Sequence, residues 1–468
     1  MKYSFFDHIA AHSYSTVILA LALAVFGFAS MALRATPRKA VFRYRLLSLS
    51  KPWVLTIGSC GLALILFSHY LTNTDASEAV MCYFGGGKFC EGPGELFLSE
   101  LLLTLGVFFV LSLFLTPSGK SLEISAQRVR LAFVICILFA LMFLLLRANS
   151  FLALYVLLEC YNMGLYVLIG TNCFREHGGY QFRWAEVALK YFIVSLISSF
   201  FLLLGIALIY FSLGTMDFSF LGLYLGGSPA GLELFAGQGL ELGLAFFTLG
   251  LCLKLGLAPF HFWVGSIYDV LPGEVFVFLM LFPKFLFLAI FSLLLTKANL
   301  CVPAWDSLVY FFNFLGLLNV MAGSLGALNQ RSVKRILIFS SISNFGYVFF
   351  GLAAQSGSAG FEAVQGYLMA YLLSNGLLVL LLWRKLGNGP WTLGALARSS
   401  GGSQALLAAL LVNFMGFPLS LPFLGKYFIV LSLLAQNNYM GPLVILLGSV
   451  ITVIYTFPLL KQVCFQRP

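Results

Sequence analysis

The chain has 468 residues, of which 60% are hydrophobic and only 9% are charged. A soluble domain carries about 25% charged residues, so this composition excludes a soluble protein and indicates a membrane protein. The formal net charge of +10 would suit a nucleic-acid-binding protein, but the basic residues gather in short loops between apolar runs, as membrane orientation requires. We therefore expect no nucleic-acid partner.

Apolar runs long enough to cross a bilayer, roughly 20 residues each, recur along the chain. They predict an all-α polytopic membrane protein with about 13 transmembrane helices and no soluble domain. The first run lacks a cleavage pattern and continues into a basic loop, so we expect no signal peptide. The predicted cores are 14–34, 52–72, 96–117, 130–146, 149–170, 185–211, 239–260, 273–295, 304–327, 335–354, 361–383, 404–436 and 440–460.

The distribution of lysine and arginine between alternate loops predicts the orientation of the chain in the membrane. When the loop after the first span is placed on the inner side, the inner loops and the C-terminus hold 19 basic residues and the outer side holds 4. This asymmetry predicts an N-terminus outside and a C-terminus inside. The nine cysteines are scattered rather than arranged for metal binding, but Cys82 and Cys90 share one polar loop. They could form a disulfide if that loop faces an oxidising space, and are free thiols otherwise.

Charged residues inside the predicted spans are the candidates for function. A charge at the bilayer centre costs several kcal/mol, so a passive bundle would hardly retain a set of such groups. Burial lowers the pKa of a lysine and a nearby carboxylate raises it again, so a buried lysine with a movable partner can load and release a proton. The candidates are the lysines Lys190, Lys254, Lys284 and Lys426 and the acid Glu159.

A structural role competes with this interpretation at each lysine. A long lysine stem near a helix end can reach the interface by snorkelling. This alternative is strongest for Lys190, which follows Glu186 by one helical turn and could simply pair with it. For the other three lysines we favour a proton relay, with Glu159 as the switching carboxylate.

Prolines interrupt two of the lysine-bearing spans. Lys254 lies five residues before Pro259, and Lys426 follows Pro418 and Pro422. Proline inside a spanning helix frees backbone carbonyls that protein or water must satisfy. Because the two spans are five apart, they predict two five-helix repeats of inverted topology, each with a Pro-broken helix. The predicted organisation is a three-helix segment over 1–128, a first repeat over 129–300 and a second over 301–468.

Polar residues near the first break allow a functional and a structural interpretation. His261 follows Pro259 and could extend a proton path, or could be hydrogen-bonded at a helix break. The hydroxyls and the amide of SSISN (340–344) could hydrate the bundle or join helices. The sequence holds no GxxxxGK[ST], HExxH or CxxC motif, so we expect no ATP hydrolysis, no metal site and no substrate chemistry in this chain.

Six stretches resemble NADH-ubiquinone oxidoreductase chain 2, the smallest of the antiporter-like membrane subunits of respiratory complex I. They occur in the order of that family, and together they are specific although each alone is a weak apolar motif. They are LLECYNMGLYVLIG (157–170), AEVALKYFIVSLISSFFLLLGIALIYFSLGTMDF (185–218), LCLKLGLAPFHFWVGSIYD (251–269), LFPKFLFLAIFSLLL (281–295), QRSVKRILIFSSISNFGYVFFGLA (330–353) and FPLSLPFLGKYF (417–428).

The resemblance gives the buried charges an order. Glu159 matches the glutamate of the fifth helix, Lys254 the lysine of the broken seventh helix, and Lys284 the central lysine of the eighth. Lys426 matches the lysine of the broken twelfth helix, where the chain 4 type carries glutamate, and Lys190 matches a further lysine in the sixth. The resemblance implies that Glu159 pairs with Lys254 and that protons shift along the three central lysines through hydrated half-channels.

The resemblance also implies the setting of the chain. It would be a proton-translocating subunit of NADH:ubiquinone reductase that performs no redox chemistry itself, because NAD, FMN, the iron–sulfur clusters and ubiquinone belong to other subunits. Its partners would be other membrane-arm subunits, including chain 4-type antiporter-like and small membrane subunits, together with phospholipids. We expect the mitochondrial inner membrane, with the N-terminus toward the intermembrane space and the C-terminus toward the matrix; the bacterial plasma membrane is the alternative.

Two other functions fit the same residues. A subunit of a multi-subunit cation/proton antiporter shares the lysine and glutamate pattern, and a purely structural subunit could carry vestigial lysines. Co-purification with an NADH-oxidising assembly separates the first of these from complex I, and substitution of Lys254 tests the second.

Overall fold

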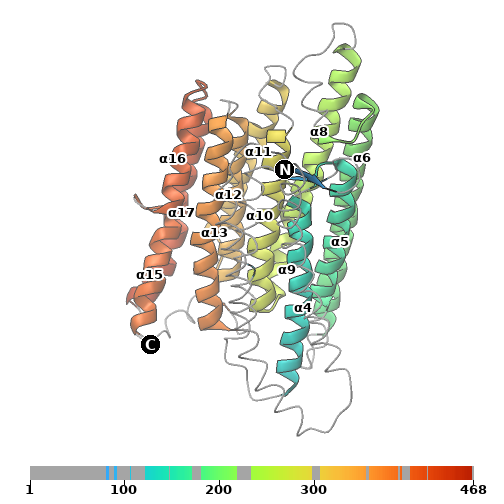
Figure 1. Cartoon of the computed structure of the whole chain (residues 1–468). Coiled ribbons are helices and arrows are strands. Elements are labelled where there is room, and N and C mark those ends of the chain that lie inside the picture. The colour runs from blue at the N-terminus through green and yellow to red at the C-terminus, as the bar shows by residue number, and fades with distance from the viewer. Residues whose placement is uncertain are drawn as a thin grey trace, which may run out of the picture. The chain divides into compact units, whose positions relative to one another are not determined.

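The computed structural model describes residues 81–83, 89–91, 106, 122–146, 148–170, 181–218, 233–297, 306–354, 358–387, 391–392, 401–418 and 420–465. The chain forms two compact units, Met1–Thr171 and Asn172–Pro468. Figure 1 shows the helices of these units with the labels used below. The predicted spans 14–34, 52–72 and 96–117 lie outside the described residues, apart from Gly106. The division into three segments at 128 and 300 stays a prediction.

The first unit contains a packed helix pair and a short hairpin. Helix α4 (Leu122–Leu146) packs on α5 (Phe151–Gly170). Strand β1 (Met81–Tyr83) pairs antiparallel with β2 (Phe89–Glu91). Apart from this hairpin and isolated bridge residues, the described residues with regular structure are helical, as expected for an all-α membrane protein.

The second unit is a bundle of mostly long apolar helices. The helices are α6 (Gln181–Leu213), α8 (Glu233–Leu255), α9 (Phe262–Val270), α10 (Gly273–Lys297), α11 (Asp306–Leu328), α12 (Val333–Ala353), α13 (Ser358–Leu386), α15 (Gly401–Met415), α16 (Leu421–Leu434) and α17 (Met440–Phe465). The predicted span 404–436 is divided into α15 and α16 at its prolines, as the proline pattern indicated. The helix of the predicted span 239–260 ends at Leu255, before Pro259, and the short helix α9 follows beyond that span.

Six helices of the described part are long and apolar enough to cross a bilayer, so the chain is a polytopic membrane protein. They are Phe151–Gly170, Ala185–Leu213, Val309–Leu328, Val333–Ala353, Ala363–Leu386 and Met440–Cys464. The total of 13 spans and the inverted repeats stay predictions.

Helix α12 is the most deeply buried of these spans. It packs against α9, α10, α11, α13, α16 and α17. Its contact with α11 is close because glycines let the two backbones approach: a Cβ at Gly346 would lie 2.8 Å from the carbonyl oxygen of Gly316 and 2.6 Å from Val320 Cγ2. The serines Ser340, Ser341 and Ser343 and the aromatic Tyr347 of α12 are therefore buried in protein.

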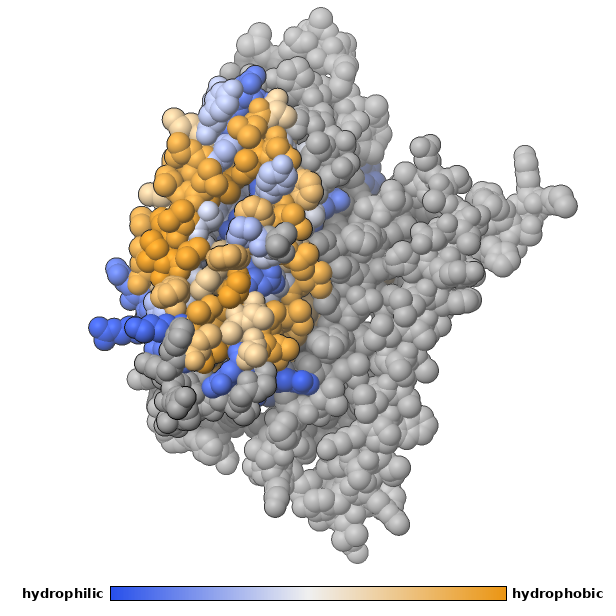
Figure 2. All heavy atoms as spheres, turned by 90° about the vertical axis from the view of Figure 1, so that its left-hand side faces the viewer, coloured by the Kyte–Doolittle hydropathy of each residue, from blue (hydrophilic) through white to orange (hydrophobic). Residues whose placement is uncertain are grey.

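The face made by α15, α16 and α17 is apolar over most of its height, with hydrophilic residues gathered near both ends (Figure 2). Its exposed side chains include Phe423, Phe428, Leu446, Val450 and Phe457. A contiguous apolar band with polar ends is typical of a membrane-protein surface that faces lipid or another subunit. The apolar side chains of such a band are stable there because they are not exposed to water.

Candidate functional site

The first helix break lies directly after Lys254, which is in the last turn of α8 and is partly buried. The chain turns at Gly256, whose φ of +65° is in the left-handed region that glycine adopts without strain. A Cβ at this position would also lie 1.9 Å from Val264 Cγ2, so only glycine fits the turn. The peptide bond between Ala258 and Pro259 is cis, and α9 begins four residues later at Phe262.

The backbone groups freed by this break are held by one buried amide, Asn319 of α11. Its Oδ1 accepts a hydrogen bond from the backbone N–H of Ala258 at 2.8 Å, and its Nδ2 donates to the Ala258 carbonyl at 3.4 Å and to the Leu315 carbonyl at 2.8 Å. A spanning segment tolerates non-helical backbone only where protein or water satisfies it. Asn319 therefore fixes the position of the break that follows Lys254.

Lys284 lies in the middle of α10, directly after Pro283, and is fully buried. Its ammonium donates a hydrogen bond to the hydroxyl of Ser341 on α12. It also lies 5.7 Å from the ring centroid of Tyr268 and 5.5 Å from that of Phe345. An ammonium in this position is surrounded by one hydroxyl and two aromatic faces, which is a weakly polar environment for a charge.

The second break positions Lys426. Helix α15 ends at Met415, Gly416 turns the chain with a φ of +78°, and Ser420 caps α16 by accepting a hydrogen bond from the N–H of Phe423 at 3.3 Å. Lys426 lies in the second turn of α16 and is buried. Its Nζ is 4.6 Å from the ring centroid of Tyr347, which comes from α12.

Helix α12 therefore contacts both Lys284 and Lys426. Ser341, which meets Lys284, and Tyr347, which meets Lys426, are six residues apart, or about 9 Å along a helix axis. The hydroxyl of Tyr347 is buried and has no hydrogen-bond partner among the residues the structure describes. The serines of SSISN (340–344) donate to backbone carbonyls of their own helix, so the interhelical bond of Ser341 comes from Lys284.

The remaining predicted site residues differ in their surroundings. Lys190 forms an ion pair with Glu186, and its side chain is 48% exposed, as the structural alternative for this residue required. His261 precedes α9, with its ring 6.2 Å from that of Phe339, and within the described ranges its buried Nδ1 has no hydrogen-bond partner. Glu159 lies in α5 of the first unit and accepts a hydrogen bond from Asn162 at 3.4 Å. Its pairing with Lys254 stays a prediction.

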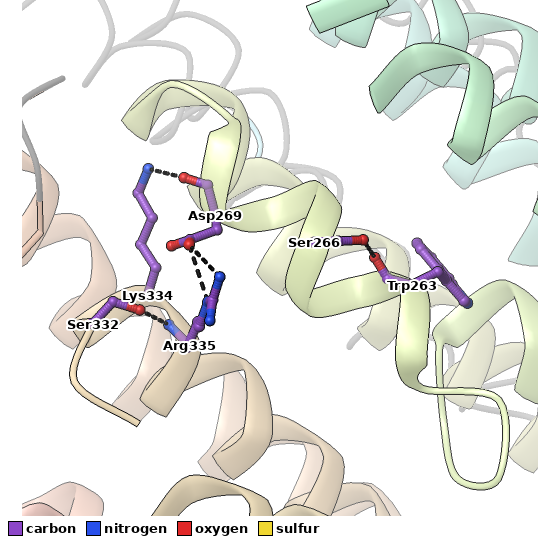
Figure 3. Close-up of polar contacts among 6 residues, drawn as sticks. All are labelled: Trp263, Ser266, Asp269, Ser332, Lys334 and Arg335. Atoms are coloured by element: carbon purple, nitrogen blue, oxygen red, sulfur yellow. Dashed lines mark hydrogen bonds and ion pairs between the residues drawn. The ribbon is translucent and has the colours of Figure 1, made fainter. Parts of the chain in front are cut away.

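A further cluster joins the start of α12 to the end of α9 (Figure 3). Arg335 forms an ion pair with Asp269, with both Nε and a terminal nitrogen 3.0 Å from Oδ2. Lys334 is buried, and its Nζ donates to the carbonyls of Leu271 at 2.7 Å and Asp269 at 3.3 Å. The last four carbonyls of a helix lack intrahelical partners, so a charged donor to two carbonyls at this point stabilises the end of α9.

Asn319, Tyr347 and Lys334 are part of the site but were not predicted from the sequence. Lys334 is one of the 19 basic residues of the predicted inner loops, and in sequence such a lysine does not differ from one that folds back onto carbonyls. Asn319 gave a signal, since it is a lone amide in the apolar run GLLNVMAG. Within the described ranges there is no group of three or more His, Cys, Asp or Glu residues that could hold a metal ion.

Fold and site together define a polytopic helical membrane protein with interrupted helices and lysines buried against one central helix. Residues 148–452 match the family model described as NADH:quinone oxidoreductase/Mrp antiporter, TM. The chain belongs to this family of membrane subunits.

Within the family, the chain is similar to proteins named NADH-quinone oxidoreductase subunit N. It is 33% identical over 341 residues to that of Sphingopyxis alaskensis, covering 70% of this chain and 68% of the relative. It is 34% identical over 337 residues to that of Granulibacter bethesdensis, covering 69% and 67%.

Three solved structures share the fold. A chain of an archaeal respiratory membrane complex, the membrane-bound sulfane sulfur reductase, gives a TM-score of 0.76 at 20% identity, covering 96% of this chain and 88% of its own. A chain of respiratory complex I from Thermus thermophilus gives 0.71 at 23% identity, covering 97% and 90%. A chain of the Mrp complex from Dietzia sp. gives 0.73 at 18% identity, covering 95% and 79%.

Replacing Asn319 by leucine is expected to loosen the break after Lys254. Each backbone group of Ala258 that loses its partner costs about 1–3 kcal/mol, which raises the population of locally opened chain about tenfold or more. Buried Cys252, one turn before the break, should then react correspondingly faster with a thiol reagent in the purified protein. The control is Asn313→Leu in the same helix, whose amide oxygen accepts from Asn438 instead; an equal rise there would contradict the role of Asn319.

Replacing Lys334 by methionine is expected to destabilise the subunit more than replacing Arg335 by methionine. The first change removes a charged donor from two carbonyls at a cost of about 1–3 kcal/mol, whereas a solvent-exposed ion pair contributes about 1 kcal/mol or less. The measurement is the temperature at which the subunit is lost from the purified complex. A larger effect of Arg335→Met would show that the ion pair, and not the bonds to the carbonyls, holds α9.

Proposed function

We propose that this chain is the proton-translocating membrane-arm subunit of respiratory complex I, and that Glu159, Lys254, Lys284 and Lys426 form its proton relay. The observation that carries the proposal is the burial of Lys284 and Lys426 against one buried helix, α12. Its setting is supported by relatives that are named subunit N of NADH-quinone oxidoreductase.

The physical argument is that both ammonium groups are desolvated, and that their contacts within the described part of the chain are a hydroxyl and aromatic rings rather than a carboxylate. A buried charge without a countercharge costs several kcal/mol of stability. A lysine at such a site therefore indicates a function that uses the binding and release of its proton. Hydroxyl and aromatic neighbours accept either protonation state of the amine. An approaching charge can then decide whether the proton is held or released.

Lys254 has a different place in the relay. It lies at the end of a half-helix, next to backbone that is not helical, where transporters bind ions. The C-terminal end of a helix favours a positive charge, so the half-helix helps to hold its proton. Glu159 would modulate that proton by pairing, and His261 would extend the path past the break.

Lys190 has a weaker claim to a role in the relay. Its ion pair with Glu186 and its exposed side chain fit a surface pair of two residues one helical turn apart. We therefore assign the translocation step to the other three lysines.

The proposed setting follows the relatives. NAD, FMN, iron–sulfur clusters and ubiquinone would be bound by other subunits, and the neighbours would be other membrane-arm subunits and phospholipids. The relatives reported above are bacterial, which supports the plasma membrane rather than the mitochondrial inner membrane. The two Pro-broken regions, α8–α9 and α15–α16, support the proposed pair of inverted repeats.

The antiporter alternative has its own observation, which is the shared fold of the Mrp complex. At 18% identity this likeness concerns the fold alone. The relatives at 33% and 34% identity are named NADH-quinone oxidoreductase subunit N.

We expect this chain to co-purify with an NADH-oxidising, quinone-reducing assembly. The physical reason is that a translocating subunit without redox groups must be driven by other subunits. The measurement is native electrophoresis of detergent-solubilised membranes, with activity staining and identification of the chain by its peptides. Its absence from the NADH-oxidising band, with presence in a separate multi-subunit complex that exchanges cations for protons, would favour the antiporter.

Methionine at Lys254, Lys284 or Lys426 is expected to impair proton translocation by the assembled complex. Loss of a positioned proton-transfer group costs about 100-fold or more in the step it serves. The measurement is the number of protons moved per electron, together with the rate of NADH oxidation, in vesicles with verified assembly.

Lys190→Met serves as the matched control, because this lysine pairs at the surface. Its stoichiometry and rate should stay close to those of the unaltered complex. Unchanged stoichiometry and unchanged rate in all three buried-lysine variants would leave only the structural role.

A further inference from the structure

We propose that Cys82 and Cys90 form a disulfide that closes the β1–β2 hairpin on the outer side of the membrane. The proposal rests on the strand register, on the sequence between the strands and on the charge distribution of the loops. It is independent of the proton relay, because neither cysteine belongs to the relay and the disulfide requires only the outer placement of this loop.

The register is the first observation. In the antiparallel pair of β1 and β2, Met81 is opposite Glu91, Cys82 is opposite Cys90, and Tyr83 is opposite Phe89. Directly opposed residues of an antiparallel pair have Cα atoms about 4.5–5.5 Å apart. Disulfides span Cα–Cα distances of about 4.4–6.8 Å, so the backbone places these two cysteines within bridging distance.

The intervening sequence is the second observation. The strands are joined by FGGGK (84–88), and three consecutive glycines permit the backbone conformations of a tight reversal. A two-stranded hairpin is marginally stable by itself in water. A covalent link between the central residues of both strands would hold the register that the hydrogen bonds alone define weakly.

The compartment is the third observation. The count of basic residues predicts that this loop lies on the outer side, which in a bacterial plasma membrane or a mitochondrial inner membrane is the oxidising side. In contrast, Cys136, Cys160, Cys252 and Cys464 lie in helices and are free thiols. Among the described residues, the hairpin is the only strand pair in which two cysteines lie opposite each other.

The reaction balances as a thiol–disulfide exchange. One thiol of the pair, as its thiolate, attacks the disulfide of an oxidised protein of the thiol–disulfide oxidoreductase class, and the second thiol then displaces that protein. One S–S bond forms in the hairpin as one breaks in the oxidant. The hairpin loses two electrons and two protons, and the oxidant gains them as two thiols.

The test counts the thiols that reduction exposes in the assembled complex. Membranes are denatured in excess N-ethylmaleimide, freed of reagent, reduced, and treated with a maleimide–polyethylene glycol that shifts the subunit on a gel by one step per thiol. We expect Cys82→Ser to lower this count by two, and Cys90→Ser to lower it by the same two. Cys301→Ser, in another predicted outer loop, should leave it unchanged. A count that neither hairpin variant lowers overturns the proposal.

A second measurement needs no variant. Lys88 is the only basic residue between the two cysteines, so trypsin cuts the chain between them. If the disulfide is present, the two fragments stay joined on a non-reducing gel and separate on a reducing gel. Separation without reductant, in protein alkylated before digestion, overturns the proposal even if a serine variant fails to assemble.

Orientation is checked separately. After reduction of right-side-out vesicles, a membrane-impermeant maleimide should label the hairpin from outside. Labelling that requires opened vesicles would show that the loop faces the reducing side, which also overturns the proposal.

Discussion

Every backbone polar group within a bilayer must find a partner in the protein or in water, and the site depends on how this chain meets that requirement. The interruption after Lys254 exposes the N–H and carbonyl of Ala258, and the amide of Asn319 binds both. The second interruption is terminated by Ser420, whose hydroxyl caps α16. The breaks can therefore persist in an apolar setting, and the two lysines beside them are held at defined places rather than on mobile loops.

The same constraint explains which parts of the structure could be predicted from the sequence. Long apolar runs fix the spans, since a bilayer admits few other structures, and Pro259 with Pro418 and Pro422 indicated where two of them are interrupted. The observed helices α8 and α9, and α15 and α16, meet near those prolines. Buried lysines were predictable for a related reason: charge inside an apolar run is rare unless it is used.

The partners of these lysines could not be predicted in the same way. The contact of Lys284 with Ser341 spans 57 positions, and that of Lys426 with Tyr347 spans 79. Neither follows from local periodicity, because both depend on how α10 and α16 pack against α12. A serine or tyrosine in an apolar helix is equally compatible with an ordinary interhelical bond. Lys190 shows the opposite case, since its partner Glu186 is one turn away and local spacing was sufficient to name it.

Helix α12 is the element that these contacts share. Its first turn is fixed to the end of α9 by Lys334 and Arg335. Its middle contacts Lys284, and about 1.7 turns further it contacts Lys426. Packed interiors do not deform continuously, so a shift of α12 would alter both lysine environments together. Both lysine side chains thus contact one buried element. The proposed proton relay would therefore need no separate structure to connect these two lysines.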